Sequence, residues 1–171
     1  MAEIRENITR TPIAAPPAPS RARAATRLTG DPDHDFLRRM SDHHLDLIRI
    51  THAAIESNRD ASLAAAIRRF EEAHDHELDA LLSLLQRIYN DAFVPQTNPE
   101  NDFIAEMLRK HRSDNMKALL EAAEKSEADA VRILNDYLPK SKQRQVRSLA
   151  EKLRREESAG VVALRKALSR Q

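Results

Sequence analysis

Apolar side chains recur every three or four positions over most of the chain after residue 31, which places them on one face of an α-helix. One such run extends from Phe36 to Ile55 and a second from Leu63 to Ile88, so we predict helices over about 31–56 and 61–90. Both Asp31-Pro32 and Asn98-Pro99 combine a capping side chain with a proline suited to a first helical turn. Each pair therefore predicts the start of a helix.

The second half of the chain predicts three more helices. A stripe from Phe103 to Ala122 indicates a long third helix, and Ser126 is the expected cap of a short helix that Pro139 ends. Ser141 opens a last helix with Val146, Leu149, Leu153, Glu156, Val161 and Leu164 on its inner stripe. Four long helices and one short one predict an all-α, antiparallel four-helix bundle.

The two halves resemble each other, which predicts a duplicated helix hairpin. At a constant offset of 67 residues the matched pairs are Asp35/Asp102, Phe36/Phe103, Met40/Met107 and His44/His111. At an offset of 79 residues they are Ile67/Val146, Phe70/Leu149 and Glu77/Glu156. We therefore divide one bundle domain, 31–171, into repeat 1 (31–91) and repeat 2 (99–171), the latter holding the short extra helix. Chance similarity between amphipathic helices is the alternative.

Composition supports helices and excludes several other classes. The chain of 171 residues has only two Gly, no Cys and 4% aromatic residues. Sheets depend on aromatic residues and phosphate-binding loops on glycines, so β folds and Rossmann folds are not expected. Residues 1–30 predict a disordered, weakly basic arm rich in Pro and Ala. They lack the apolar run of an export signal, and no stretch of 18 apolar residues predicts a membrane span.

The formal net charge of +1 conceals a basic last helix. Residues 140–171 hold ten bases and three acids, whereas residues 31–91 hold 13 acids and seven Arg. The basic strip can pack beside the acidic half, or meet nucleic acid or anionic lipid. No aromatic residue is interleaved with these bases, so nucleic acid is not the expected partner. A homo-oligomer remains open.

Polar groups on the inward stripes predict a metal site, because burying them is costly unless each has a partner. We expect Met40, His43 and His44 to be the main ligands, with His74 and Glu77 completing the site from the second helix. Imidazole suits copper, zinc, nickel or iron and a thioether favours Cu(I), so copper is the first expectation and zinc or iron the next. The remaining candidates, which form a weaker second site, are Met107 and His111.

Other readings of these residues stay open. The histidines can be hydrogen-bonded core residues and the methionines core filler, which would make the protein a metal-free helical scaffold or interaction module. Only one Glu-x-x-His, Glu71 with His74, is present, so the four-helix di-iron motif is incomplete. No His-Glu-x-x-His or Ser/His/Asp set occurs, and we predict binding without turnover of a substrate.

The string Asp35-Phe36-x-x-x-Met40-x-x-His43-His44, followed by Phe70-x-x-x-His74-x-x-Glu77-Leu78, resembles the bacterial ferritin-like group called domain-of-unknown-function family 305. That family carries Met-x-x-His-His on one helix and Gln-x-x-Glu-Ile on the next. Over residues 31–171 the resemblance implies a ferritin-like bundle, commonly periplasmic or secreted, with some members linked to copper binding and tolerance. His74 replaces the family's Gln, and Lys110 replaces a His in the second copy.

Overall fold

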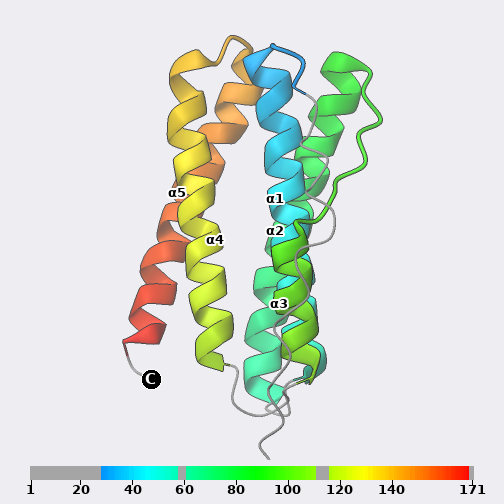
Figure 1. The fold of residues 1–171 in the computed structure, drawn as a ribbon. Helices are drawn as coiled ribbons and strands as arrows, with labels where there is room; N and C mark the ends of the chain where they lie inside the picture. The colour runs from blue at the N-terminus through cyan, green and yellow to red at the C-terminus, as the bar shows by residue number, and fades with distance from the viewer. Residues whose placement is uncertain (1–27, 58–60, 111–115, 170–171) are drawn as a thin grey trace, which may run out of the picture.

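A computed structural model describes residues 28–57, 61–110 and 116–169. These parts of the chain contain helices and no strand (Figure 1), which confirms the all-α prediction. The helices are α1 (Pro32–Ser57), α2 (Ala61–Tyr89), α3 (Pro99–Lys110), α4 (Met116–Tyr137), the 3₁₀ turn η1 (Leu138–Lys140) and α5 (Arg144–Leu168).

Two of the predicted caps begin their helices where expected, whereas the last helix begins at Arg144, three residues after the predicted Ser141. Asp31 Oδ1 accepts a hydrogen bond from the amide of Asp33 at 2.9 Å, one residue into α1. Asn98 Oδ1 accepts one from the amide of Glu100 at 3.1 Å in the first turn of α3. At the other end of α2, Asn90 adopts φ of 50°, a left-handed conformation that ends a helix. Local signals in the sequence therefore determine these boundaries.

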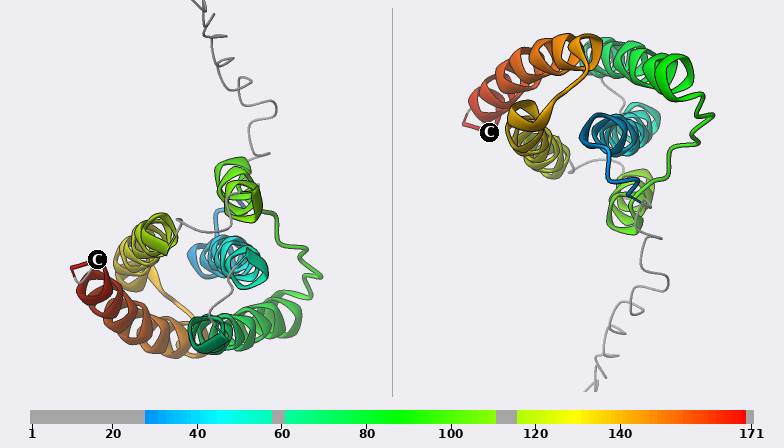
Figure 2. Two further views of the ribbon diagram at one scale, coloured as in Figure 1. Left: turned by 90° about the horizontal axis from the view of Figure 1, so that it is seen from below. Right: turned by 90° about the horizontal axis from the view of Figure 1, so that it is seen from above.

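The helices form two packed pairs, α1 with α2 and α4 with α5. Seen end-on, α1 lies between α2, α3 and α4, while α5 lies beside α2 and α4 (Figure 2). After α2, residues 90–98 and α3 return along the bundle, so α2 and α4 run in the same direction (Figure 1). The two pairs are thus connected by one long crossover.

The prediction of one long third helix followed by a short one is wrong. The structure has a short α3 that ends at Lys110 and a long α4 of 22 residues that runs in the opposite direction. Ser126, the expected cap, lies inside α4. The short extra helix is therefore α3, which packs against α1, and the second hairpin is α4–α5.

Carboxylates on α1 hold the crossover in place. Asp42 accepts a hydrogen bond from the amide of Gln96 at 2.8 Å, and Asp46 accepts one from the amide of Asn98 at 2.6 Å. Both carboxylates are buried, so these contacts are shielded from water. They connect the return segment to the α1 surface opposite α2.

Asp91 provides a further anchor for the crossover. Its carboxylate contacts His34 Nε2 and Arg38 Nε, each at 2.8 Å. His34 also stacks on Tyr89, with ring centroids 4.2 Å apart. His34 is therefore half-buried, whereas His52 and His76 are exposed.

The core has two apolar clusters with a polar layer between them. The upper cluster joins all four long helices, for example through Leu37, Leu81, Leu134 and Leu153. The lower cluster contains Ile50, Ala53, Ala54, Ile67, Ala105, Leu108 and Leu119. Along α1, α2 and α4, the buried His and Glu side chains occupy positions between the members of the two clusters.

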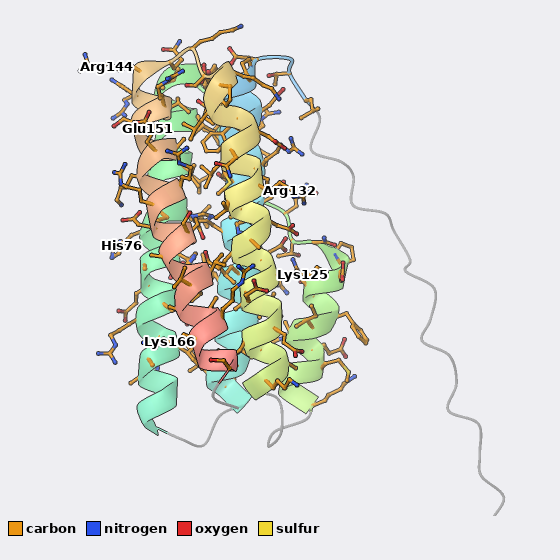
Figure 3. All side chains as sticks on the ribbon, turned by 90° about the vertical axis from the view of Figure 1, so that its left-hand side faces the viewer. His76, Lys125, Arg132, Arg144, Glu151 and Lys166 are labelled. Atoms are coloured by element: carbon orange, nitrogen blue, oxygen red, sulfur yellow. The ribbon has the colours of Figure 1, made fainter. Side chains whose placement is uncertain are left out.

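Charged side chains cover the outside of the bundle. The labelled residues, among them Lys125, Arg144 and Lys166, project away from the helices (Figure 3). Within the described ranges, no helix is long and apolar enough to cross a membrane. Of the predicted arm, residues 1–30, the structure describes only 28–30.

Candidate metal centre

Five buried polar side chains from four helices form the layer between the apolar clusters. They come from α1 (His44), α2 (His74 and Glu77), α4 (Glu127) and α5 (Glu157). None is more than 8% exposed, and His44 is completely buried. Three carboxyl groups in such a place are costly unless they are paired or coordinate a metal. The cluster therefore requires a chemical explanation.

The five side chains form two groups that share Glu157. In the first, His44 Nε2 lies 3.2 Å from Glu77 Oε2 and 3.7 Å from Glu157 Oε1. In the second, His74 Nε2 lies 3.3 Å from Glu127 Oε1 and 4.0 Å from Glu157 Oε2. Ligand atoms held about 2.0–2.2 Å from one ion are at most about 4.4 Å apart. All four distances fit that limit, so each group could hold an ion.

A backbone contact orients His74 toward the centre. Its Nδ1 lies 2.8 Å from the carbonyl oxygen of Phe70, and a carbonyl can only accept, so Nδ1 carries the hydrogen. In the neutral ring Nε2 therefore keeps its lone pair and faces Glu127. This arrangement, with one ring nitrogen fixed by a carbonyl and the other facing the ligand cluster, is usual for histidines that bind metals.

Glu157 lies between the two histidines of the cluster. Both of its carboxyl oxygens are buried, and one contacts His44 while the other contacts His74. The Glu127 carboxyl group lies within hydrogen-bond distance of it as well. A buried carboxyl group that faces two imidazoles and a second carboxyl group is placed to bridge two ions.

A glycine makes room for Glu127. A Cβ added to Gly160 on α5 would lie 3.1 Å from both Cδ and Oε2 of that carboxyl group. Glycine inside a helix costs about 0.5–1 kcal/mol relative to alanine. The chain has only two glycines, and one of them, Gly160, lies where the Glu127 carboxyl group needs the space.

Burial and neighbouring charges shift the pKa values of the side chains in the cluster. Burial lowers the pKa of His44 to about 3, and the nearby His74 adds to this effect. Burial by itself would lower the pKa of His74, but the contact with Glu127 raises it overall. Burial, followed by the facing Glu127 carboxyl, raises the pKa of Glu157 well above its usual range. Both of these shifts favour the protonated forms of His74 and Glu157, and a bound ion would compete with those protons.

The structure brings three of the predicted ligands, His44, His74 and Glu77, into this cluster. His43 lies beside the cluster, with its ring centroid 5.7 Å from that of His44. Its Nε2 is buried and has no hydrogen-bond partner in the described part of the chain. Burial lowers the pKa of His43 to about 3. Met40 lies one turn before His44 within the upper apolar cluster. A ligand role for His43 and Met40 stays a prediction.

The predicted second site is not assembled in the described residues. Met107 lies on α3, which contributes no side chain to the described His/Glu cluster, and it is 38% exposed. His111 lies outside the described residues. Their part in metal binding also stays a prediction.

Sequence reasoning missed Glu127 and Glu157. Glu157 continues the buried stripe of Val146, Ala150 and Leu153, four residues after the last of them. The expected Glu156 is instead exposed and contacts Lys152 at 3.4 Å. Glu127 follows Leu119 and Ala123 on the inner face of α4. A charged residue in phase with an apolar stripe was the available signal in both cases.

No family model, no curated protein and no solved structure matches the chain. The resemblance to domain-of-unknown-function family 305 therefore stays a prediction.

Proposed function

We propose that this protein binds divalent transition-metal ions in the His/Glu cluster. The observation that carries the proposal is the buried Glu157 carboxyl group, which is shared by the two His/Glu groups. Ions would supply the positive charge that three buried carboxyl groups need. The protein's own contribution is a dry, shaped site with His74 fixed by a backbone carbonyl.

The ligand groups support two ions that share Glu157. His44 with Glu77 would hold one, and His74 with Glu127 the other. Ligands from four helices and one long crossover are also typical of ferritin-like bundles, so we propose that bundle type despite the incomplete Glu-x-x-His motif.

The ligand atoms of the cluster limit which metal ions we expect it to bind. Two imidazoles and three carboxylates suit Zn(II), Fe(II), Mn(II) or Cu(II), whereas Cu(I) prefers thioether and thiolate donors. Copper therefore stays in the proposal as Cu(II), and Cu(I) would require Met40 to join. Metal handling or tolerance, as the resemblance to family 305 implies, is the proposed role.

Two adjacent glutamates on α5 give a matched test. Glu157 is 2% exposed and faces the cluster, whereas Glu156 is exposed. We expect metal-free wild type and Glu156→Gln to bind Zn(II), Cu(II), Fe(II) or Mn(II) at pH 7, as measured by elemental analysis after gel filtration. We expect Glu157→Gln to lose most of this binding.

Thermal melting provides a second readout. An ion at 100 times its Kd should stabilise the folded chain by about 2.7 kcal/mol, with a corresponding rise in Tm. If none of the four ions binds the wild type, or if Glu157→Gln binds as well as Glu156→Gln, the proposal is wrong. The chain would then be the metal-free scaffold considered above.

A further inference from the structure

An apolar cavity of about 190 Å³ lies next to the proposed metal centre. It is lined by side chains of all four long helices, chiefly Ile67, Phe70, Leu119, Leu120, Ala123 and Leu164, and is open on one side. The cavity occupies the side of the metal centre on which the lower apolar cluster lies, and it shares Ile67 and Leu119 with that cluster.

The walls offer nothing to a polar ligand. The one hydroxyl in the lining belongs to Thr51, and it is already donated to the carbonyls of Leu47 at 3.0 Å and Ile48 at 2.9 Å. Water needs two to four polar partners to remain in a cavity. Moving an apolar molecule from water onto an apolar surface of this kind is favourable, and the water it displaces loses no hydrogen bond to the walls. Size and chemistry therefore both favour a small uncharged apolar molecule.

Phe70 belongs to both the cavity and the metal centre. Its side chain lines the cavity, and its ring centroid lies 4.3 Å from that of His74. Its carbonyl is the group that fixes His74 Nδ1. On α4, Ala123 lies one turn before Glu127. A molecule in the cavity would therefore be separated from a metal ligand by a single aromatic ring.

The cavity is open to solvent. Ala66, which lines it on α2, is exposed, and Leu120 and Leu164 are half-buried. A small molecule could enter without separating the helix pairs.

We infer that this cavity binds a small uncharged hydrocarbon-like molecule, and that its occupancy is transmitted through Phe70 to His74. The first part stands on the cavity alone. The second rests on the proposed function, because it requires an ion at His74.

The first experiment uses benzene and the metal-free chain. We expect saturable binding of benzene to the wild type. The measurement is the change in NMR chemical shift of the methyl groups around the cavity. Ala123→Leu fills the cavity and should weaken binding at least tenfold. Ala118→Leu, the same change at an exposed position of α4, should leave it unaltered.

Leu164→Phe, which fills the cavity from α5, is the second cavity-filling variant. It replaces Ala123→Leu if circular dichroism shows that Ala123→Leu does not fold. Absence of saturable binding to the folded wild type would overturn the inference. Equal binding by a folded cavity-filled variant would also overturn it.

The second experiment uses the full chain loaded with Co(II), whose visible absorption reports on its ligands. Saturating benzene should shift the absorption bands of the wild type but not those of the cavity-filled variant. If Co(II) binds and its spectrum does not respond, transmission to His74 is refuted. If Co(II) and the other ions do not bind at all, the proposed function fails, whereas the benzene result on metal-free protein still decides the first part.

Discussion

Replacing Gly160 by alanine adds one methyl group at the point where α5 faces the Glu127 carboxyl. In most helices this change stabilises a protein, because alanine is favoured over glycine by about 0.5–1 kcal/mol. Here the new Cβ would lie 3.1 Å from the carboxyl carbon and one oxygen, closer than ordinary van der Waals contact. The direction of the effect therefore depends on whether Glu127 can move.

The structure leaves Glu127 little freedom to do so. It is 1% exposed, and its Oε1 is held 3.3 Å from His74 Nε2. Overpacking a core by one methyl group costs about 1–3 kcal/mol. After subtracting the helix gain, we expect the metal-free protein to lose about 0–2 kcal/mol. We expect metal affinity to fall about 10- to 100-fold, as for other changes to groups that support metal ligands.

The assay combines urea unfolding of metal-free protein with competitive titration by a chelator of known affinity. Ala159→Gly, at the exposed neighbouring position, is the control: it should lose about 0.5–1 kcal/mol and keep its metal affinity. If Gly160→Ala instead gains about 0.5–1 kcal/mol and binds metal normally, the glycine does not exist to accommodate Glu127, and the reasoning fails.

Three other changes test different parts of the structure. Glu157→Met should abolish metal binding and raise the free energy of unfolding of the metal-free protein by about 1–3 kcal/mol, since it removes a polar group whose burial is costly; urea unfolding that shows a loss would contradict this. Asp33→Ala removes the acceptor for the Tyr137 hydroxyl and for the amides of Lys142 and Gln143 at 3.0 Å each, and should cost about 2–4 kcal/mol in the same assay. For Asp91→Asn we expect a loss of about 1 kcal/mol at pH 7. The hydrogen bond from Arg38 lowers the pKa of Asp91, so this difference should disappear as the pH falls below 3.8, and a constant difference down to pH 2 would refute the cause.

Local signals in the sequence were sufficient for most of the helices. Asp31, Asn98 and the apolar stripes predicted the start of α1 and α3 and the inner faces of α1 and α2, because caps and periodicity act over a few residues. The same reasoning found His44, His74 and Glu77, which interrupt those stripes at helical spacing. These three residues all belong to the first hairpin.

The second hairpin could not be predicted as well. Ser126 has the chemistry of a cap, and a helix that began there would place Glu127 in its first turn, where the helix dipole favours an acid. In α4 the tertiary packing overrides that local preference, and Glu127 faces the interior. On α5 the error was a single position: Glu156 was placed on a stripe with Leu149, whereas the buried stripe contains Ala150 and Leu153 and continues to Glu157.

The single long crossover between α2 and α4 has a consequence for how the protein would acquire the proposed ions. His44, His74 and Glu77 belong to one hairpin and Glu127 and Glu157 to the other, so neither hairpin contains the whole cluster. Bringing such distant positions together is entropically costly, and we expect it late in folding. Ions available during biosynthesis would then favour the docked arrangement over two loosely associated halves, and metal supply would help to control the yield of native protein.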